Sequence, residues 1–277
     1  MKNKLKDQFS ITQKVIVITG AAGLLGRQYA DAVASFGGLP ILLDINSKPL
    51  KELVSELNNK YGVDSKGYVV DITKESELEQ NCKDILDRYA GIDALVNNAA
   101  NNPKVDDQNN KYFSRLEDFS IEDWQMDISV GLTGAFLCAK HYGTSISNNP
   151  EGGVIINISS DLGLIAPDQR LYEKTDLTED QQAVKPVTYS VIKTGLIGLT
   201  RYLSTYWPNR VRCNALCPGG VDTGLPDEFV NKVIERIPMG RMATPNEYQA
   251  ALIFLLSDAS KYMNGAVIPM DGGRSCW

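Results

Sequence analysis

VIVITGAAGLLGR, Val15 to Arg27, is the stretch that decides the fold, because three glycines join five residues of buried-strand character to a helical pattern. Gly20 allows the tight turn, Gly23 lets a pyrophosphate approach the backbone, and Gly26 lets the helix lie close to the sheet. The helix then presents its free N–H groups and the positive end of its dipole to an anion. Glycines also gather in ordinary turns, so the stretch indicates nucleotide binding only together with its context.

That context is a carboxylate at the end of the next predicted strand. Asp44 lies 18 residues beyond Gly26 (44 − 26), where a carboxylate that binds a ribose diol is expected. Such a carboxylate accepts hydrogen bonds from both ribose hydroxyls of NAD but repels the 2′-phosphate of NADP, and Ile45 is apolar where an arginine would be needed. Arg27 follows the last glycine into the helix and is expected at the surface or at the pyrophosphate rim. The sequence therefore favours NAD over NADP.

The composition indicates one large domain over residues 1–277, with a polar amino-terminal tail over residues 1–12. A chain of 277 residues with 43% hydrophobic content can bury one full core. Its net charge of −6 and pI of about 5.0 argue against nucleic-acid and anionic-membrane partners, which select a basic surface. The tail lacks the apolar core of a signal peptide, and no later segment has 18 uninterrupted apolar residues. We therefore expect a cytoplasmic protein.

Cysteine and histidine usage argues against a metal site and against a disulfide framework. The five cysteines are odd in number and none form a C-x-x-C pair. Cys213 and Cys217 lie in an apolar run and are expected to pack in the core. His141 is the only histidine, which excludes histidine clusters and disfavours a triad of serine, histidine and acid. His141 itself is expected on a helix, at the surface or half-buried.

Predicted strands and helices alternate along the chain, which indicates a parallel sheet. Right-handed crossovers then give a single-domain, Rossmann-like, doubly wound α/β fold of about seven strands with helices on both faces. Strands are predicted over residues 15–19, 40–44, 67–70, 92–96, 154–158, 211–216 and 266–270. Helices are predicted after Gly26 and over residues 50–61, 76–89, 121–146, 187–207 and 246–256. Residues 101–118 and 167–186 lack periodicity and are expected to form loops at the carboxyl edge of the sheet, where ligands of such folds bind.

Two later stretches carry groups suited to proton transfer. Tyr189-Ser-Val-Ile-Lys193 puts a phenol and an ammonium four positions apart on one helix face, and the ammonium is expected to lower the pKa of the phenol. Ser159 and Ser160 end a predicted strand, where Ser160 can hydrogen-bond a reacting oxygen. Each feature alone also occurs as a chance helix pattern or as turn-forming serines. Their combination indicates exchange of a proton with an alcohol or a carbonyl.

With these motifs, the chain resembles the short-chain dehydrogenase/reductase family nearly end to end, from about Thr12 to Gly273. The matching pieces are TGAAGLLG (19–26), Asp71 after the third predicted strand, NNAA (97–100), ISS (158–160), YSVIK (189–193), PGGVDT (218–223) and MDGG (270–273). The resemblance implies that Tyr189 is the general acid and base, that Ser160 holds the substrate oxygen, and that Lys193 tunes Tyr189 and binds the nicotinamide ribose.

The same resemblance implies where the cofactor and a second copy of the chain bind. Asp71 would meet the adenine, Asn97 would line the cleft, and residues 218–223 would cover the nicotinamide, with Thr223 near its carboxamide or the phosphates. Relatives commonly form homodimers or homotetramers through the helices at 121–146 and 187–207. The implied cofactor contacts also include Gly20, Gly23, Leu24, Leu25, Asp44, Ile72, Asn98, Ala99, Ala100, Tyr189, Lys193, Pro218, Gly219 and Val221.

The chain departs from the family pattern at three places. Leu24 stands where classical members have glycine, and Gly23 restores the spacing of the extended branch, although the length and the PGG and DGG endings fit the classical branch. Gly131 stands where the family carries an asparagine that anchors a water of the proton relay to the lysine. Two alternatives follow: an extra water takes the place of the asparagine side chain and preserves the relay, or the relay is absent. An insertion over residues 168–186 separates Ser160 from Tyr189 and is either a solvated or interface element or a substrate cover.

These features predict an NAD-dependent oxidoreductase that interconverts a secondary alcohol and a ketone. The polar side chains of the insertion suit a sugar or another hydroxyl-rich or phosphorylated substrate. The amino-acid sequence of the insertion is similar to that of oxidoreductases of bacterial flagellin and surface-glycan pathways. Two alternatives stay open. One is a nucleotide-binding subunit with little turnover, which Gly131 motivates, and the other is an epimerase or dehydratase that retains its NAD.

Overall fold

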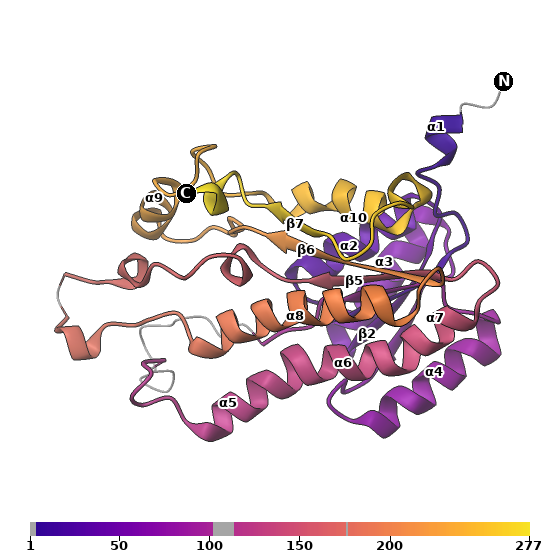
Figure 1. Cartoon of the computed structure of the whole chain (residues 1–277), viewed down its shortest axis with the longest axis horizontal. Coiled ribbons are helices and arrows are strands. Elements are labelled where there is room, and N and C mark those ends of the chain that lie inside the picture. Colours follow the sequence, from indigo (N-terminus) through magenta and orange to yellow (C-terminus); the bar gives the residue numbers. More distant parts are fainter. Residues whose placement is uncertain (1–3, 102–113, 176) are drawn as a thin grey trace.

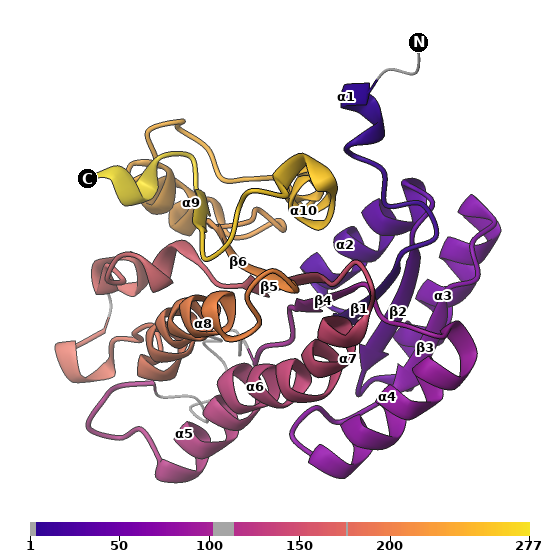
Figure 2. The same ribbon diagram turned by 45° about the vertical axis from the view of Figure 1, so that its right-hand side comes forward.

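The predicted strands form one parallel sheet of seven strands in the order β3-β2-β1-β4-β5-β6-β7. Figure 1 shows the sheet among its helices, and Figure 2 labels β1 to β6. The structure is a computed structural model that describes residues 4–101, 114–175 and 177–277. The strands are β1 (Val15–Thr19), β2 (Leu39–Asp44), β3 (Lys66–Val69), β4 (Ala94–Asn97), β5 (Gly153–Ile158), β6 (Val211–Pro218) and β7 (Val267–Met270). Since β1 pairs with both β2 and β4, the strand order reverses there, and the carboxyl ends of β1 and β4 border the crevice where ligands of such sheets bind.

Helices cover both faces of the sheet because its strands are apolar on both faces (Figure 2). Successive residues of a strand point to opposite faces, so Ile16 and Ile18 join one core and Val15 and Val17 the other. The first core lies under α2 (Leu24–Ser35), α3 (Ser47–Tyr61) and α10 (Gln249–Leu256). The second lies under α4 (Glu75–Tyr89), α8 (Val187–Tyr206) and the long helix between β4 and β5. This arrangement confirms the doubly wound architecture.

The helix predicted over residues 121–146 is one continuous helical stretch with two wider turns. It runs through α5 (Ile121–Ile128), the π-turn η2 (Ser129–Thr133), α6 (Gly134–Cys138), the π-turn η3 (Ala139–Gly143) and α7 (Thr144–Asn148). A glycine lies in each π-turn at a close contact, since a Cβ on Gly131 would meet Ile192 of α8 and a Cβ on Gly143 would meet the Trp207 ring. Periodicity predicted the helix but not these turns.

Two helices lie outside the predicted set. α1 (Lys4–Asp7) falls within the expected amino-terminal tail, and α9 (Asp227–Ile234) follows the glycines after β6. α9 has eight residues, too few for a clear helical period. Four of them, Phe229, Val230, Val233 and Ile234, share one apolar cluster with Leu171 of the insertion. The apolar face of this short helix therefore packs against the start of the insertion.

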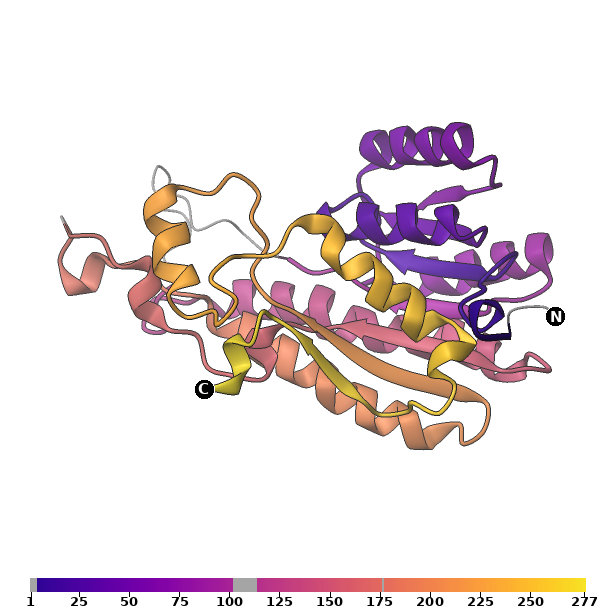
Figure 3. The ribbon, with the colours of Figure 1, turned by 90° about the horizontal axis from the view of Figure 1, so that it is seen from above.

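The insertion is docked on the rest of the molecule. Its described residues form the short 3-10 turns η5 (Gln169–Tyr172) and η6 (Glu179–Gln181), and Leu171 is 4% exposed. Asp168 pairs with the Arg236 guanidinium at 2.6 Å, just beyond α9. The insertion and α9 lie at the end of the molecule towards which the strands point (Figures 1 and 3). The start of the insertion, residues 168–172, therefore packs against the α9 region, while most of its described residues from Glu173 to Gln181 are exposed.

The remaining side chains named from the sequence lie as expected. Cys213 and Cys217 are fully buried, which confirms their place in the core. His141 is half-buried in the long helix, with its Nε2 atom 3.2 Å from Glu75 Oε1. None of the helices in the part of the chain that the structure describes is long and apolar enough to cross a membrane. Most of residues 101–118 lie outside that part, so the loop predicted there is not described further.

Candidate active site

The turn from β1 to α2 requires its glycines. Gly20 has φ +61°, and a Cβ there would lie 2.8 Å from Ala99 Cα. A Cβ on Gly26 would lie 2.2 Å from Gly20 O, so the first turn of α2 rests directly on the glycine loop. Gly23 begins α2 with no side-chain cap, which leaves the N–H groups of the first turn, at Leu24 and Leu25, to an external acceptor. A shallow, uncapped helix terminus of this kind fits a dinucleotide pyrophosphate.

The end of β4 holds the glycine turn in place. Asn98 Nδ2 donates to Thr19 O at 3.0 Å and to Gly20 O at 3.1 Å, while the N–H groups of Asn98 and Ala99 donate to Thr19 Oγ1. Ala100 follows, exposed, at the edge of the described segment. Asn97 differs from its expected role, since it is 4% exposed and donates to Asn157 Oδ1 at 2.9 Å. Its side chain lies beneath the cleft, not along it.

Asp44 ends β2 beside the same turn. Its Oδ2 accepts from Ala22 N at 3.0 Å, and its Oδ1 accepts from the backbone and side-chain N–H groups of Asn46. The carboxylate is 8% exposed, so it supports the glycine turn as well as facing the predicted ribose site. Ile45 beside it is 67% exposed. The residue after Asp44 is therefore an exposed apolar one.

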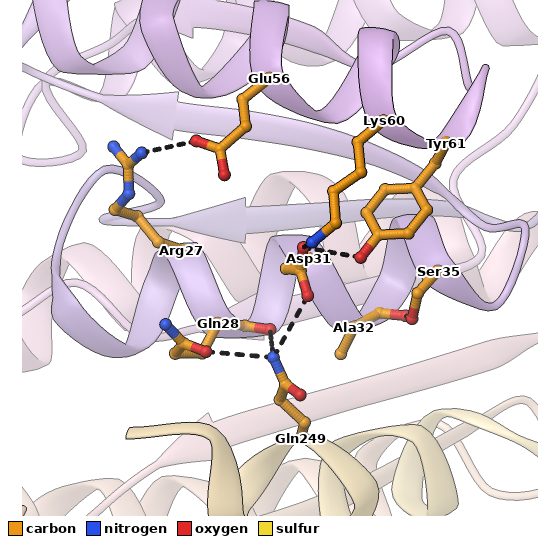
Figure 4. Close-up of polar contacts among 9 residues, drawn as sticks. All are labelled: Arg27, Gln28, Asp31, Ala32, Ser35, Glu56, Lys60, Tyr61 and Gln249. Atoms are coloured by element: carbon orange, nitrogen blue, oxygen red, sulfur yellow. Dashed lines mark hydrogen bonds and ion pairs between the residues drawn. The ribbon is translucent and has the colours of Figure 1, made fainter. Parts of the chain in front are cut away.

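Arg27, the basic residue nearest to the glycines, is held in a polar cluster between α2 and α3 (Figure 4). Its guanidinium lies 2.9 Å from Glu56 of α3. The cluster continues with Lys60, whose Nζ lies 2.9 Å from Asp31. Arg27 therefore lies at the surface in an ion pair with Glu56, and the surface was one of its two expected positions.

The ends of β3 and β6 bring the other expected contacts to the same edge of the sheet. Asp71 Oδ1 accepts from Thr73 Oγ1 at 2.6 Å, and this bond is the main cause that lowers the pKa of Asp71. Ile72 is 7% exposed. Gly219 N donates to Met270 O at 2.9 Å, which ties the Pro218 turn to β7. Farther along, Val221 bridges to Ala243 and Thr223 is exposed.

Ser160, Tyr189 and Lys193 come together at the carboxyl end of β5. Tyr189 and Lys193 lie on the first turns of α8, and the Lys193 Nζ is 5.7 Å from the centroid of the Tyr189 ring. Lys193 donates to Ile158 O at 2.9 Å, and Ser159 Oγ donates to Lys193 O at 2.7 Å. Ser160 and Lys193 are 5% and 6% exposed. Ser160, which precedes the insertion, therefore lies with Tyr189 and Lys193 in one site, where Ser160 and Lys193 are buried and Tyr189 is half-buried.

The expected effect of lysine on the tyrosine is wrong for the protein alone. Burial raises the pKa of Tyr189, a hydrogen bond with Ser160 acts in the opposite direction, and the Asp161 charge raises it further. Burial also lowers the pKa of Lys193 to about 8, and the charge of Lys185 adds to that decrease. The sequence argument counted the attraction between phenolate and ammonium but not the cost of removing both from water.

Three further polar residues of the site were not assigned from the sequence. Lys185 of the insertion lies over the Tyr189 ring, with Nζ 3.9 Å from its centroid. Asp161 accepts a hydrogen bond from Ser160 at 2.7 Å, and Arg274 pairs with Asp161 at 2.9 Å. Asp161 directly follows Ser160, so its position was a signal that could have been used. Arg274 carries no such signal, since only the fold brings it to this site.

Gly131 has a packing reason. A Cβ on Gly131 would lie 2.7 Å from Ile192 Cγ2, so the helix around η2 and α8 approach each other closely there. The volume that a larger side chain would need at residue 131 is filled by Ile192, which is 4% exposed. Close helix packing therefore accounts for the glycine.

Replacing Gly131 by Ala tests this packing. We expect a loss of about 0–2 kcal/mol in the free energy of unfolding, because overpacking costs about 1–3 kcal/mol and the helix propensity of alanine returns about 1 kcal/mol. Gly198→Ala is the matched control on exposed α8 backbone, where no atom lies within 4 Å of the new Cβ, and it should stabilise. Urea unfolding measures both. Equal stabilisation by the two variants would contradict the packing argument.

Known proteins match this chain over nearly its whole length. The family model described as "Enoyl-(Acyl carrier protein) reductase" matches residues 20–275. An NADP-dependent mannitol dehydrogenase from Alternaria alternata is 31% identical over 278 residues, which cover 98% of this chain and 95% of that protein. A solved short-chain type dehydrogenase/reductase from Mycobacterium marinum has a TM-score of 0.84 and 25% identity over 99% of each chain. A solved NAD⁺-bound xylitol dehydrogenase has a TM-score of 0.82 and 25% identity over 95% of this chain and 99% of that one.

Proposed function

The chain belongs to the short-chain dehydrogenase/reductase family, and from this premise we propose that it is an NAD(H)-dependent oxidoreductase of sugars or polyols. The observation that carries the proposal is that Ser160, Tyr189 and Lys193 meet at the sheet edge that also bears the glycine turn. The names of the similar mannitol and xylitol dehydrogenases support a polyhydroxylated substrate. The reaction class is interconversion of a secondary alcohol and a ketone.

The residues of the chain divide the proton chemistry among them. A bound nicotinamide supplies the hydride acceptor or donor. Tyr189 as phenolate takes the proton of the substrate hydroxyl, and Ser160 holds the oxygen from which that proton leaves. Lys193, whose pKa burial lowers to about 8, would bind the nicotinamide ribose, as the family resemblance implies. Because burial raises the pKa of Tyr189, alcohol oxidation should become faster as the pH rises, and ketone reduction slower.

The insertion acts in this proposal as a substrate cover. It reaches the site through Lys185, which lies over the Tyr189 ring, and it is fixed at its other end to α9. Its polar side chains suit hydroxyl-rich substrates. Because the sequence of the insertion is similar to that of oxidoreductases of flagellin and surface-glycan pathways, glycan-type sugars are among the substrates to test.

A substrate screen tests the proposed function. Purified protein is mixed with NAD⁺ and with mannitol, xylitol or glycan-type sugars, and NADH formation is followed by absorbance. NADH formation with at least one polyol or sugar is the expected result. Substrate conversion without net NADH would instead indicate an epimerase or a dehydratase that retains its cofactor. Cofactor binding with no conversion of any substrate would indicate a nucleotide-binding subunit.

The preference for NAD over NADP rests on Asp44, although the similar mannitol dehydrogenase is named as NADP-dependent. We expect the protein to bind NADH more tightly than NADPH by at least about tenfold, or about 1.4 kcal/mol, because a 2′-phosphate would face the Asp44 carboxylate. Asp44→Ser combined with Ile45→Arg should reverse the order. Fluorescence titration gives both dissociation constants, and Asp44→Asn removes the charge together with one of the two oxygens that accept from Ala22 and Asn46. Tighter NADPH binding by the unaltered protein would overturn the assignment.

We also infer that the protein forms a homodimer or a homotetramer through the long helix and α8. Exposed apolar side chains on these elements support the inference, among them Met126, Phe136 and Tyr202, which are 52%, 51% and 61% exposed. Light scattering coupled to size-exclusion chromatography measures the mass in solution. A monomer at micromolar concentration would contradict the inference.

A further inference from the structure

A buried ion pair lies directly behind Ser160. Asp161 begins the 3-10 turn η4 (Asp161–Gly163), and its side chain is 4% exposed. Ser160 Oγ donates to Asp161 Oδ1 at 2.7 Å, and Leu162 N donates to the same oxygen at 2.8 Å. The second oxygen, Oδ2, accepts from Arg274 at 2.9 Å. Both oxygens of the carboxylate are therefore bound, one to the reactive serine and one to a cation.

Arg274 is brought to this place by a well-fixed turn after β7. Asp271 Oδ1 accepts from Gly273 N at 3.0 Å and Oδ2 accepts from Ser275 N at 2.9 Å, while Gly273 has φ +89°. The turn also lies against the Pro218 loop, since a Cβ on Gly219 would be 2.7 Å from Asp271 Cα. The Arg274 side chain is 9% exposed. The guanidinium therefore has little freedom to leave Asp161.

The ion pair is expensive to bury, which points away from a purely stabilising role. Removing two charges from water costs several kcal/mol each, and well-packed apolar residues often replace such pairs without loss of stability. The carboxylate also lies beside Tyr189, where its charge raises the pKa of the phenol. Arg274 opposes that charge at close range. Geometry and charge thus connect the pair to Ser160 and Tyr189.

We propose that Asp161 and Arg274 are positioning residues of the active site, Asp161 by orienting the Ser160 hydroxyl and Arg274 by holding Asp161 and balancing its charge. Ser160 has one hydrogen, and Asp161 accepts it. The Ser160 oxygen accepts from Leu162 N at 3.2 Å, so Asp161 and Leu162 together fix the hydroxyl in the protein alone. When substrate binds, the Ser160 hydrogen turns from Asp161 to the reacting oxygen and holds it while Tyr189 takes the proton. This inference rests on the proposed oxidoreductase function, in which Tyr189 exchanges the proton.

Other charged and titratable groups also face Tyr189, and the test must leave them unchanged. Lys193 lies one turn along α8, and Lys185 lies over the ring from the segment before α8. The Tyr172 phenol of η5 is close enough to Tyr189 to interact with it electrostatically. Substituting Asp161 or Arg274 leaves these three groups in place. The two substitutions change the charge beside Tyr189 in opposite senses.

The experiment compares pH profiles of kcat/KM for oxidation of xylitol or mannitol, whichever the unaltered protein oxidises faster. Arg274→Met leaves the Asp161 carboxylate unbalanced, so the apparent pKa of the Tyr189 limb should rise by at least about half a unit. Asp161→Asn keeps an acceptor for Ser160 but removes the charge, so that pKa should fall. Arg274→Lys should restore most of the profile. Arg241→Met, which breaks an exposed ion pair with Glu247, is the matched control and should shift nothing.

A second measurement does not depend on turnover. Tyrosine labelled with ¹³C at Cζ reports the ionisation of Tyr189 by NMR, with Tyr189→Phe assigning the signal. The same opposite displacements are expected in the protein without substrate. If the unaltered protein forms no NADH at any pH, the proposed function fails, and the NMR titration still tests the ion pair.

Shifts in the same direction for Arg274→Met and Asp161→Asn, or no shift beyond that of Arg241→Met, would overturn the proposal. Thermal unfolding of each variant checks that it is folded. If Arg274→Met does not fold, Asp161→Asn and Arg274→Lys decide the question, because an unchanged profile for Asp161→Asn contradicts the proposed role of its charge. A purely structural ion pair would change stability and leave the profile where it is.

Discussion

Tyr189→Phe should lower kcat by about 10²–10⁴-fold while the dissociation constant of NADH changes little, because general acid–base catalysis contributes a factor of that size. Phenylalanine keeps the ring and therefore the packing beneath Lys185, but it has no proton to exchange with the substrate. The rate of NADH formation, followed by absorbance, gives kcat, and fluorescence titration gives the dissociation constant of NADH. The variant isolates the hydroxyl from the rest of the site.

The pH dependence of the oxidation rate is a second test of the role of Tyr189. The unaltered protein should oxidise its substrate faster as the pH rises towards the raised pKa of Tyr189, whereas any residual activity of the phenylalanine variant should not follow that limb. Ser204→Ala is a suitable control, because Ser204 lies on the same helix and donates only to Arg201 O. Activity within a few-fold of normal in Tyr189→Phe would refute the assignment of the proton to Tyr189.

Gly26→Ala should abolish dinucleotide binding and destabilise the protein by more than about 3 kcal/mol, which is the upper range for overpacking. The new Cβ would lie 2.2 Å from Gly20 O and 2.8 Å from Ala21 Cα, both of them backbone atoms that cannot rotate away. The glycine turn and the start of α2 would have to separate. Urea unfolding measures the stability, and NADH titration measures the binding.

The control for this substitution is Gly198→Ala, where the same added methyl group meets no atom within 4 Å. It should raise stability by up to about 1 kcal/mol through helix propensity. A Gly26→Ala protein with near-normal stability would mean that α2 can shift away from the loop without cost. That outcome would remove the geometric basis for the dinucleotide site.

Features set by neighbouring residues could be predicted from the sequence. The turn at Gly20 to Gly26 was predicted correctly because backbone freedom and close contact are local properties of glycine. The sheet followed from alternating apolar segments. In contrast, α9 was missed because eight residues hold only two helical turns, and its apolar side chains are explained by Leu171 of the insertion.

The candidate site was predictable to a smaller extent. Ser160, Tyr189 and Lys193 could be found because Ser160 follows the end of a predicted strand, and Tyr189 and Lys193 have the Y-x-x-x-K spacing at the start of a predicted helix. The pKa of Tyr189 was misjudged, since burial depends on every element that packs around it. The contact of Arg274 with Asp161 could not be predicted, because the two residues are 113 positions apart and no period relates them.

The start of the insertion is docked on α9 by two kinds of contact. Leu171 joins the two segments through a shared apolar cluster, and Asp168 joins them through Arg236. Hydrogen bonds from Arg170 and Arg236 hold the pKa of Asp168 well below its usual range, so this link persists in mild acid. Because an apolar contact and an ion pair both join the insertion to the α9 region, a substitution that loosens α9 is expected to loosen the insertion as well.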